Sequence, residues 1–159
     1  MTIRDAEIKD IPFIEKMLVQ ICTVHSQSRP DLFRNGGQKY TAKEIEDMIN
    51  DSNRPVFVAY DENNDITVGY AMCILSDVKN NSALCDARSL YLDDLCVDEN
   101  VRGQGIGSMI FSHIKKYAER NDIHNLTLNV WEGNDSAKKF YDKQNMNVQK
   151  TTLELIFDK

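Results

Sequence analysis

Apolar residues recur along the chain with two spacings, and together these predict an alternation of strands and helices. Recurrence every three to four residues is typical of amphipathic helices, whereas short β-branched and aromatic runs are typical of strands. The expected helices cover 11–22, 41–50, 105–121 and 135–144, and the expected strands cover 2–6, 55–60, 66–76, about 89–97, 126–130 and 148–157, the last as one strand or two. The resulting order, β-α-α-β-β-β-α-β-α-β, is that of a mixed α/β layer arrangement.

Polar segments separate these elements and supply start signals for two of the helices. Asp10 followed by Pro12 is typical of a helix N-terminus, and Thr41 with Glu44 has the spacing of a capping box. The segments 26–38 and 77–88 are polar or rich in turn formers, so we expect loops there.

Three glycines crowd into five positions between an expected strand and an expected helix. Gly103, Gly105 and Gly107 are three of the seven glycines in the chain. A helix N-terminus leaves its first N–H groups unpaired and carries a partial positive charge, and glycine lets an anion approach those donors closely. The sequence therefore predicts an anion-binding loop suited to a diphosphate.

The spacing of this loop excludes two common phosphate-binding loops. It lacks the Gly-Lys-Ser/Thr of a P-loop, and Ser108 stands where a dinucleotide-binding Gly-x-Gly-x-x-Gly requires its last glycine. A dinucleotide fingerprint would also lie in the first βα turn, whereas this loop comes late in the chain. What remains is Arg-x-x-Gly-x-Gly, from Arg102 to Gly107.

Composition narrows the classes of function. The 159 residues suit one domain, 1–159, with 42% hydrophobic and 28% charged residues. The net charge of −6 argues against nucleic acid as a partner, because that binding needs clustered Lys and Arg. No signal peptide or long apolar span is visible, and the four cysteines lack Cys-x-x-Cys spacing. We therefore expect reduced, mostly buried cysteines and a cytoplasmic protein that does not bind membranes.

The histidines do not indicate a metal site. His25, His113 and His124 are scattered and show no ligand spacing with one another or with cysteine. His113 falls near the apolar stripe of its expected helix, which favours a partly buried structural residue.

The glycine loop resembles the acetyl-CoA loop of the GNAT family of N-acetyltransferases. A second segment supports this resemblance, because Asn134 to Tyr141 fits that family's Asn-x-x-Ala-x-x-Phe-Tyr pattern. The two segments occur in the family's order, with a helix and a strand expected between them. The resemblance implies an α/β fold with a mixed, mostly antiparallel sheet and helices on both faces, and it implies acetyl-CoA as cosubstrate without a metal.

The resemblance also implies which residues hold acetyl-CoA. Backbone N–H groups of the strand before the loop would polarise the thioester carbonyl, and the loop itself would hold the diphosphate. The implied cofactor-binding residues are Leu95, Cys96, Val97, Arg102, Gly103, Gln104, Gly105, Ile106, Gly107, Ser108, Asn134, Ala137 and Tyr141.

Two adjacent carboxylates are the candidates for proton removal from the amine. Asp93 and Asp94 stand in an otherwise apolar strand, where Asp is depleted, and successive strand side chains face opposite ways unless a bulge intervenes. The run 90–95 resembles the Tyr-Leu-Glu-Asp segment of the diamine (spermidine/spermine) acetyltransferases. By this match Asp93 is the base, with a water relay because Asp is shorter than Glu, and Asp94 helps to bind the ammonium. Tyr141 stands at the family's acid position.

These residues predict transfer of an acetyl group from acetyl-CoA to a primary amine, with a polyamine, diamine or other small cationic amine as first acceptor. Protein N-termini, lysine side chains and aminoglycosides stay open as acceptors, as does a non-catalytic acyl-CoA sensor. The segment from Arg29 to Asp31 does not match the diamine enzymes, and Arg29, Asp31 and Arg34 are either acceptor contacts or solvated loop charges. A homodimer is also left open, because members of the family are often dimers.

Overall fold

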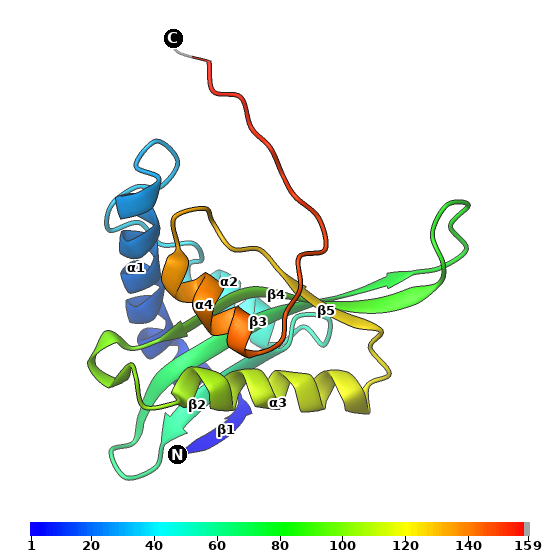
Figure 1. Ribbon diagram of the computed structural model, residues 1–159. Coiled ribbons are helices and arrows are strands. Elements are labelled where there is room, and N and C mark those ends of the chain that lie inside the picture. Colours follow the sequence, from blue (N-terminus) through cyan, green and yellow to red (C-terminus); the bar gives the residue numbers. More distant parts are fainter. Residues whose placement is uncertain (158–159) are drawn as a thin grey trace.

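The fold is a five-stranded sheet with helices packed against both of its faces, as the computed structural model shows for residues 1–157 (Figure 1). The elements in chain order are β1 (Thr2–Asp5), the 3-10 helix η1 (Ile8–Asp10), α1 (Ile11–Ser28), α2 (Ala42–Ile49), β2 (Val56–Asp61), β3 (Ile66–Val78), β4 (Ala87–Val97), the 3-10 helix η2 (Glu99–Val101), α3 (Ile106–Arg120), β5 (Asn125–Leu128) and α4 (Asp135–Lys143).

The sheet follows the chain order from β1 to β5, and only its last pairing is parallel. Strands β1 to β4 pair antiparallel with their neighbours, whereas β4 and β5 run parallel. A parallel pair needs a crossover connection, and α3 provides it. The predicted α/β class with a mixed, mostly antiparallel sheet is therefore confirmed.

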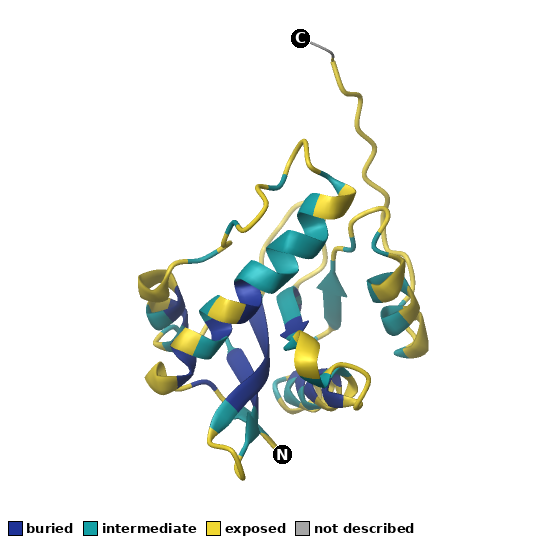
Figure 2. Ribbon diagram, turned by 90° about the vertical axis from the view of Figure 1, so that its left-hand side faces the viewer, coloured by how far each residue is buried: buried dark blue, intermediate teal, exposed yellow. Residues whose placement is uncertain are grey.

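Two apolar cores lie on opposite faces of the sheet. Helices α1 and α2 cover one face, where Ile14, Leu18 and Ile45 pack against the buried Tyr70 and Met72 of β3. Helix α3 covers the other face with the buried residues Ile106, Ile110, Phe111 and Ile114, and α4 adds Phe140 and Tyr141 at its margin. Figure 2 shows the central strands buried between these helical layers. The helical spacing of apolar residues identified these buried faces correctly.

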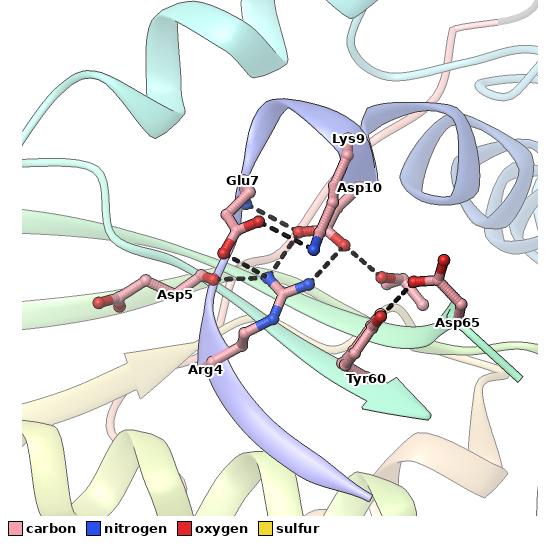
Figure 3. Close-up of polar contacts among 8 residues, drawn as sticks. Arg4, Asp5, Glu7, Lys9, Asp10, Tyr60 and Asp65 are labelled. Carbon is pink, nitrogen blue, oxygen red and sulfur yellow. Dashed lines mark hydrogen bonds and ion pairs between the residues drawn. The ribbon is translucent and has the colours of Figure 1, made fainter. Parts of the chain in front are cut away.

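A buried ion pair connects the start of α1 to the sheet. Asp10 is 1% exposed and receives two hydrogen bonds from the Arg4 guanidinium, at 2.7 and 3.0 Å, as well as bonds from the Glu7 N–H and the Thr67 hydroxyl (Figure 3). Asp10 was expected as the cap of the helix that follows it, yet its side chain makes no cap bond to α1. It instead completes the capping box of η1 and joins β1, η1 and β3. Burial alone would raise the pKa of Asp10, but these hydrogen bonds outweigh it and lower the pKa.

Three predicted boundaries were too short. Helix α1 continues to Ser28 instead of stopping near residue 22, and the Arg29 N–H still bonds to the His25 carbonyl. Strands β3 and β4 extend through 77–78 and 87–88, because Asp77 pairs with Arg88 and the two side chains form an ion pair of 2.9 Å. Cross-strand pairing of this kind cannot be read from local sequence.

The predicted terminal strand at 148–157 was wrong for the chain as described. Residues 147–157 are exposed and form no strand, and in both views they extend away from the helices and the sheet (Figures 1 and 2). The segment has the composition of a strand, but a strand also needs a neighbour to satisfy its backbone groups.

Candidate active site

A bulge in β4 turns the two adjacent carboxylates toward the same side of the sheet. Met72 pairs with Asp94 and Cys73 pairs with Leu92, so Asp93 is the extra residue on β4. Leu92 and Cys73 pack in the core on the α3 side, whereas Met72, opposite Asp94, packs on the α1 side. Without the extra residue, strand alternation would have put Asp94 on the α3 side with Leu92.

Strand β4 parts from β5 immediately before these carboxylates. The last pair joins Leu92 to Leu128, while β4 continues to pair with β3 as far as Val97. The segment from Leu95 to Val97 therefore has one ladder edge that β5 does not cover. Backbone groups on such an edge are open to a ligand. One of them, the Val97 carbonyl, accepts a hydrogen bond of 2.9 Å from Arg102 Nε.

The glycine loop leads from this edge into α3 through a left-handed backbone. Gly103 and Gly105 both have φ of +80°, and a Cβ at either position would meet nothing within 4 Å. The conformation, and not the packing, therefore requires glycine there. Ile106 is buried and anchors the helix start, whereas Gln104 and Ser108 are exposed.

The N–H groups of this loop make no regular hydrogen bonds to the described part of the chain. Within residues 1–157, none of the backbone N–H groups from Gly103 to Ser108 donates a hydrogen bond of ordinary geometry, and the Met109 N–H is the first of α3 to bond back, to the Gly105 carbonyl. These donors lie at the positive end of a helix of 15 residues. The arrangement fits the diphosphate of coenzyme A in both charge and donor placement.

Gly107 connects the loop to the helix that carries Tyr141. A Cβ on Gly107 would lie 3.4 Å from Phe140 Cε2, so α3 and α4 approach closely at this point. The rings of Phe111 and Tyr141 pack edge to face with centroids 5.8 Å apart. The loop and the tyrosine therefore belong to one packed unit and are not remote from each other.

Helix α4 begins as the sequence predicted. Asn134 caps it, with its side-chain oxygen accepting a hydrogen bond of 3.1 Å from the Ala137 N–H. This cap orients the first turn of α4, so that Asn134, Ala137 and Tyr141 lie along one side of the helix at spacings of three and four residues.

A cavity of about 550 Å³ lies where β4 and β5 separate. Its walls come from α1, the loop after α1, β4, the segment after β5 and α4. Among the predicted site residues it is lined by Asp93, Asp94, Leu95, Asn134, Ala137 and Tyr141. The glycine loop does not line it, which is consistent with a long cosubstrate that binds by its diphosphate at one end and presents its thioester at the other.

Asp93 is held by two residues from the loop between α1 and α2. Its Oδ1 lies 3.0 Å from Lys39 Nζ, its Oδ2 accepts a hydrogen bond of 2.6 Å from the Tyr40 hydroxyl, and its backbone carbonyl accepts one of 3.1 Å from Lys39. Burial and the neighbouring Asp93 raise the pKa of Tyr40, so its hydroxyl stays protonated. Nothing in the local sequence marked Lys39 or Tyr40 as partners of a residue more than fifty positions away.

Asp94 differs from Asp93 in its surroundings. It is half-buried against the α1 side of the sheet, and the side chains of Lys39 and Tyr40 bond to Asp93 instead. Burial raises the pKa of Asp94 to about 6, with the charge of Asp93 acting in the same direction and Lys39 opposing it. The Tyr70 hydroxyl and the Leu95 N–H also act on the Asp94 carboxylate and lower its pKa. The hydroxyl of Tyr70 is buried on the same face and, within the described chain, has no hydrogen-bond partner of ordinary geometry.

Tyr141 shares the cavity with Asp94. Burial is the main cause of its raised pKa, and the charge of Asp94 adds to it. The phenol is therefore protonated at neutral pH and available as a proton donor.

The cysteines only partly follow the sequence prediction. Cys73 and Cys96 are buried, and burial raises the pKa of each thiol to about 12. Cys85 is exposed and Cys22 is half-buried, so the expected burial was wrong for Cys85. Cys96 points into the core on the α1 side, where it behaves as a small apolar residue.

The charged residues of the long loop separate into two groups. Arg34 lines the cavity together with His25, Phe33 and Trp131. Arg29 instead pairs with Asp31 at 2.7 Å and lies outside the cavity wall. A second hollow of about 670 Å³ next to this loop contains none of the predicted catalytic residues.

Residues 1–157 contain neither a membrane-spanning helix nor a cluster of metal-binding side chains. No helix there is long and apolar enough to cross a membrane. Likewise, no group of three or more His, Cys, Asp or Glu side chains in that range could hold a metal ion.

Comparison with known proteins places these features in a family. Residues 20–146 match the acetyltransferase (GNAT) family profile. The curated protein named "Probable N-acetyltransferase san" from Drosophila melanogaster is 33% identical over 81 residues, which is 50% of this chain and 41% of that protein. The chain thus spans well under two thirds of that relative's length.

Solved structures agree with the fold. A crystal structure of a mutant protein from Bacillus halodurans is 30% identical, with a TM-score of 0.93 over 99% of both chains. An aminoglycoside acetyltransferase from an uncultured soil metagenomic sample is 18% identical, with a TM-score of 0.71 over 99% of this chain and 95% of that one, a likeness of fold alone. Because the family profile matches most of the chain and the architecture agrees, the chain belongs to the acetyltransferase (GNAT) family.

Proposed function

We propose that the acceptor is a small cationic amine, with a diamine or polyamine as the first candidate. The observation that carries this proposal is the position of Lys39. Its primary ammonium lies between the carboxylate and the backbone carbonyl of Asp93, at 3.0 and 3.1 Å, on the wall of the cavity. A site that binds one alkylammonium from its own chain has the charge and the acceptors to bind the ammonium of a substrate.

We assign the cosubstrate to three segments. The N–H groups from Gly103 to Ser108 would hold the diphosphate, aided by the Arg102 guanidinium, which also fixes the end of β4. The uncovered edge from Leu95 to Val97 would receive the pantetheine arm, and Asn134 and Ala137 would contact it from α4. When bound, acetyl-CoA supplies the acetyl thioester that the amine attacks.

We assign the base to Asp94 in preference to Asp93. An alkylammonium with a pKa near 10.4 must lose a proton before it can attack a carbonyl. Asp94 lacks the ion pair that Lys39 makes with Asp93, and its pKa is raised to about 6, both of which favour proton acceptance, directly or through one water. The oxygens of Asp93 already bind the Lys39 ammonium and the Tyr40 hydroxyl. This carboxylate is therefore better placed to bind the ammonium of a substrate than to accept a proton.

We assign the remaining proton transfer to Tyr141. As the new C–N bond forms and the C–S bond breaks, N–H groups of Leu95 to Val97 would stabilise negative charge on the carbonyl oxygen. The Tyr141 hydroxyl then donates its proton to the leaving thiolate and is reprotonated by the second proton that the nitrogen loses as the amide forms, while the proton taken by Asp94 returns to solvent. Protonation of Tyr141 at neutral pH supports this role.

An aminoglycoside is the second candidate acceptor. The fold of the metagenomic aminoglycoside acetyltransferase is similar over nearly the whole chain, although at 18% identity this concerns the fold alone. Aminoglycosides are also polycationic, so they would use the same two carboxylates. Protein N-termini and lysine side chains stay as further alternatives that the same assay would separate.

The test is release of free thiol from acetyl-CoA with a panel of diamines, polyamines, aminoglycosides and peptides. We expect the highest kcat/KM with a diamine or polyamine. The kcat/KM should be lower for acceptors in which a methyl group replaces the second amine. A preference for neutral or peptide acceptors over every polycation would overturn the proposed substrate class. The Tyr141→Phe variant gives the background rate.

A further inference from the structure

Lys39 is the lysine that the described chain places on the wall of the cavity of about 550 Å³ where β4 and β5 separate. Its Nζ lies 3.0 Å from Asp93 Oδ1 and 3.1 Å from the Asp93 carbonyl, and its side chain is 43% exposed. Asp94 and Tyr141 line the same cavity. The chain therefore presents a primary amine of its own beside the groups assigned to ammonium binding, proton removal and thiolate protonation.

The residues on either side of Lys39 are anchored, so the loop holds this amine in place. Gln38 Nε2 donates hydrogen bonds to Glu15 Oε1 at 3.0 Å and to the Tyr40 carbonyl at 2.5 Å. The Tyr40 hydroxyl bonds to Asp93 at 2.6 Å. An amine that is fixed beside a reaction site has a much higher effective concentration than a free amine. Lys39 therefore competes with any amine that enters the cavity from solution.

The ion pair between Lys39 and Asp93 is weak enough to release the amine. An ion pair in which one partner reaches water contributes little to stability, and the Lys39 side chain is such a partner. The flexible stem of a lysine lets Nζ move while the backbone of the loop stays anchored. Asp94, the next residue of β4, is turned by the bulge toward the same side of the sheet as Asp93. The amine can therefore move from the binding carboxylate to the carboxylate assigned as the base.

Lys43 and Lys138 lie away from this cavity, although each also has a carboxylate partner. Lys43 pairs with Glu46 and Asp47 of its own helix, and Lys138 pairs with Glu132. Neither lysine lines the cavity. Because the three lysines carry the same amine, a difference in their reaction with acetyl-CoA would come from position alone.

We propose that Lys39 Nζ is a site of self-acetylation, modified by the acetyl-CoA that its own chain binds. This inference rests on the proposed function, because it uses the same carboxylates and Tyr141. The Lys39 ammonium gives one proton to Asp94, and the neutral nitrogen attacks the thioester carbonyl. The C–N bond forms, the C–S bond breaks, and Tyr141 protonates the leaving thiolate. The nitrogen then gives its second proton to Tyr141 and Asp94 releases its proton to solvent, so the products are N-acetyl-lysine and free coenzyme A.

Acetylation of Lys39 opens the ammonium site at Asp93 to an acceptor. The amide that forms carries no charge, so the ion pair with Asp93 Oδ1 is lost. The ammonium of a diamine can then take the place of the lysine at this carboxylate. The modification therefore raises the affinity for cationic acceptors once the enzyme has met acetyl-CoA.

The test is incubation of the full-length chain with acetyl-CoA and no added amine, followed by intact mass measurement and peptide mapping. We expect each chain to gain one acetyl group, at Lys39, at a rate at least about tenfold above the rate at Lys43. The fraction modified per unit time should not depend on protein concentration, because the reaction occurs within one chain. Lys39→Arg should remove this gain in mass, and Lys43→Arg, the matched control, should keep it.

Two further readouts separate enzymatic acetylation from direct chemical acetylation by acetyl-CoA. Tyr141→Phe should lower the rate at Lys39 to the background rate measured at Lys43. Preincubation with acetyl-CoA should lower KM for a diamine by about 3- to 10-fold in wild type and have no effect in Lys39→Arg. An unchanged KM in fully acetylated wild type would exclude the opening of the ammonium site.

Acetylation of Lys39 no faster than that of Lys43, or equally fast in Tyr141→Phe, would overturn the proposal. A fraction modified that rises in proportion to protein concentration would also overturn it, because transfer would then occur between copies. If diamines are acetylated while Lys39 stays unmodified, this inference fails and the proposed function stands. If Lys39 is acetylated and no polycation reacts, the proposed acceptor class fails and this inference stands.

Discussion

Lys39 and Asp93 form an ion pair of 3.0 Å that joins the loop before α2 to the bulge of β4. They are 54 positions apart in the sequence, and the same lysine also bonds to the backbone carbonyl of Asp93. An ammonium therefore already occupies one side of the cavity. An incoming cationic acceptor would have to share this site with Lys39 or displace it.

Replacing Lys39 by Met should strengthen acceptor binding. The substitution keeps the apolar stem but removes the competing ammonium, so we expect KM for a diamine to fall by about 3- to 10-fold, the equivalent of about 1 kcal/mol. Steady-state kinetics with varied diamine at saturating acetyl-CoA would measure it. Lys43→Met, which removes a lysine paired only with exposed residues of its own helix, is the control and should leave KM unchanged. A rise in KM for Lys39→Met alone would indicate that Lys39 positions Asp93 instead of competing with the acceptor.

The two carboxylates should differ in their effect on the pH profile. Wild-type kcat should increase with pH through the range around 6, since Asp94 must be deprotonated to accept a proton and burial raises its pKa to about 6. Asp94→Asn should lower kcat by about 10²- to 10⁴-fold and remove the increase of kcat with pH around 6. Asp93→Asn should mainly raise KM for the amine. If Asp93→Asn removes this pH dependence of kcat and Asp94→Asn keeps it, then Asp93 is the base and Asp94 binds the ammonium.

Unfolding measurements would show that Asp94→Asn acts on chemistry and not on folding. A carboxyl whose pKa is raised in the folded state destabilises it at every pH above that pKa, and this cost disappears as the pH falls. The variant should therefore be at least as stable as wild type at pH 8. A variant that unfolds more easily at pH 8 would invalidate the kinetic comparison.

Gly105→Val should weaken coenzyme A binding by more than about tenfold. The φ of +80° at Gly105 costs a β-branched residue at least about 1–2 kcal/mol, and relaxation would move the N–H groups that face the diphosphate. Gly36→Val is the matched control, because Gly36 has φ of +70° and open space but lies in another loop. Calorimetry with coenzyme A should show the loss only for Gly105→Val. Equal affinities in both variants would exclude the glycine loop as the diphosphate site.

Arg4→Met should destabilise the protein by about 3–5 kcal/mol, because it leaves the Asp10 carboxylate buried without its charged partner. In wild type the pKa of Asp10 is lowered, so its stabilising contribution is complete above its ordinary pKa of 3.8 and is lost as the pH falls through the lower folded value. Urea unfolding at pH 7 and pH 3 would measure both effects. Lys43→Ala, which breaks only exposed pairs, should cost less than about 0.5 kcal/mol. Comparable losses for the two variants would contradict the role given to Asp10.

Local sequence patterns predicted most of the fold because they report each element's own requirements. The apolar spacing of α3, the capping box of α2 and the start of α4 at residue 135 are all visible within a few residues. The cluster of Gly103, Gly105 and Gly107 likewise marked the loop between β4 and α3, although the left-handed backbone at Gly103 and Gly105 was seen only in the structure. These features were predicted correctly since the residues that cause them are neighbours in the chain.

Contacts between distant segments could only be seen in the tertiary structure. The bulge at Asp93 reverses the facing of Asp94, and it depends on the register between β3 and β4. The partners of Asp93 come from a loop 53 and 54 residues away, and no local pattern marked them. The segment 148–157 carries a strand pattern that its own chain does not pair. By itself the sequence determined the elements, the glycine loop and the residue types available for catalysis. The tertiary structure decided which carboxylate is paired with Lys39 and Tyr40 and, within the described residues, which segment stays unpaired, because both depend on contacts between segments far apart in the chain.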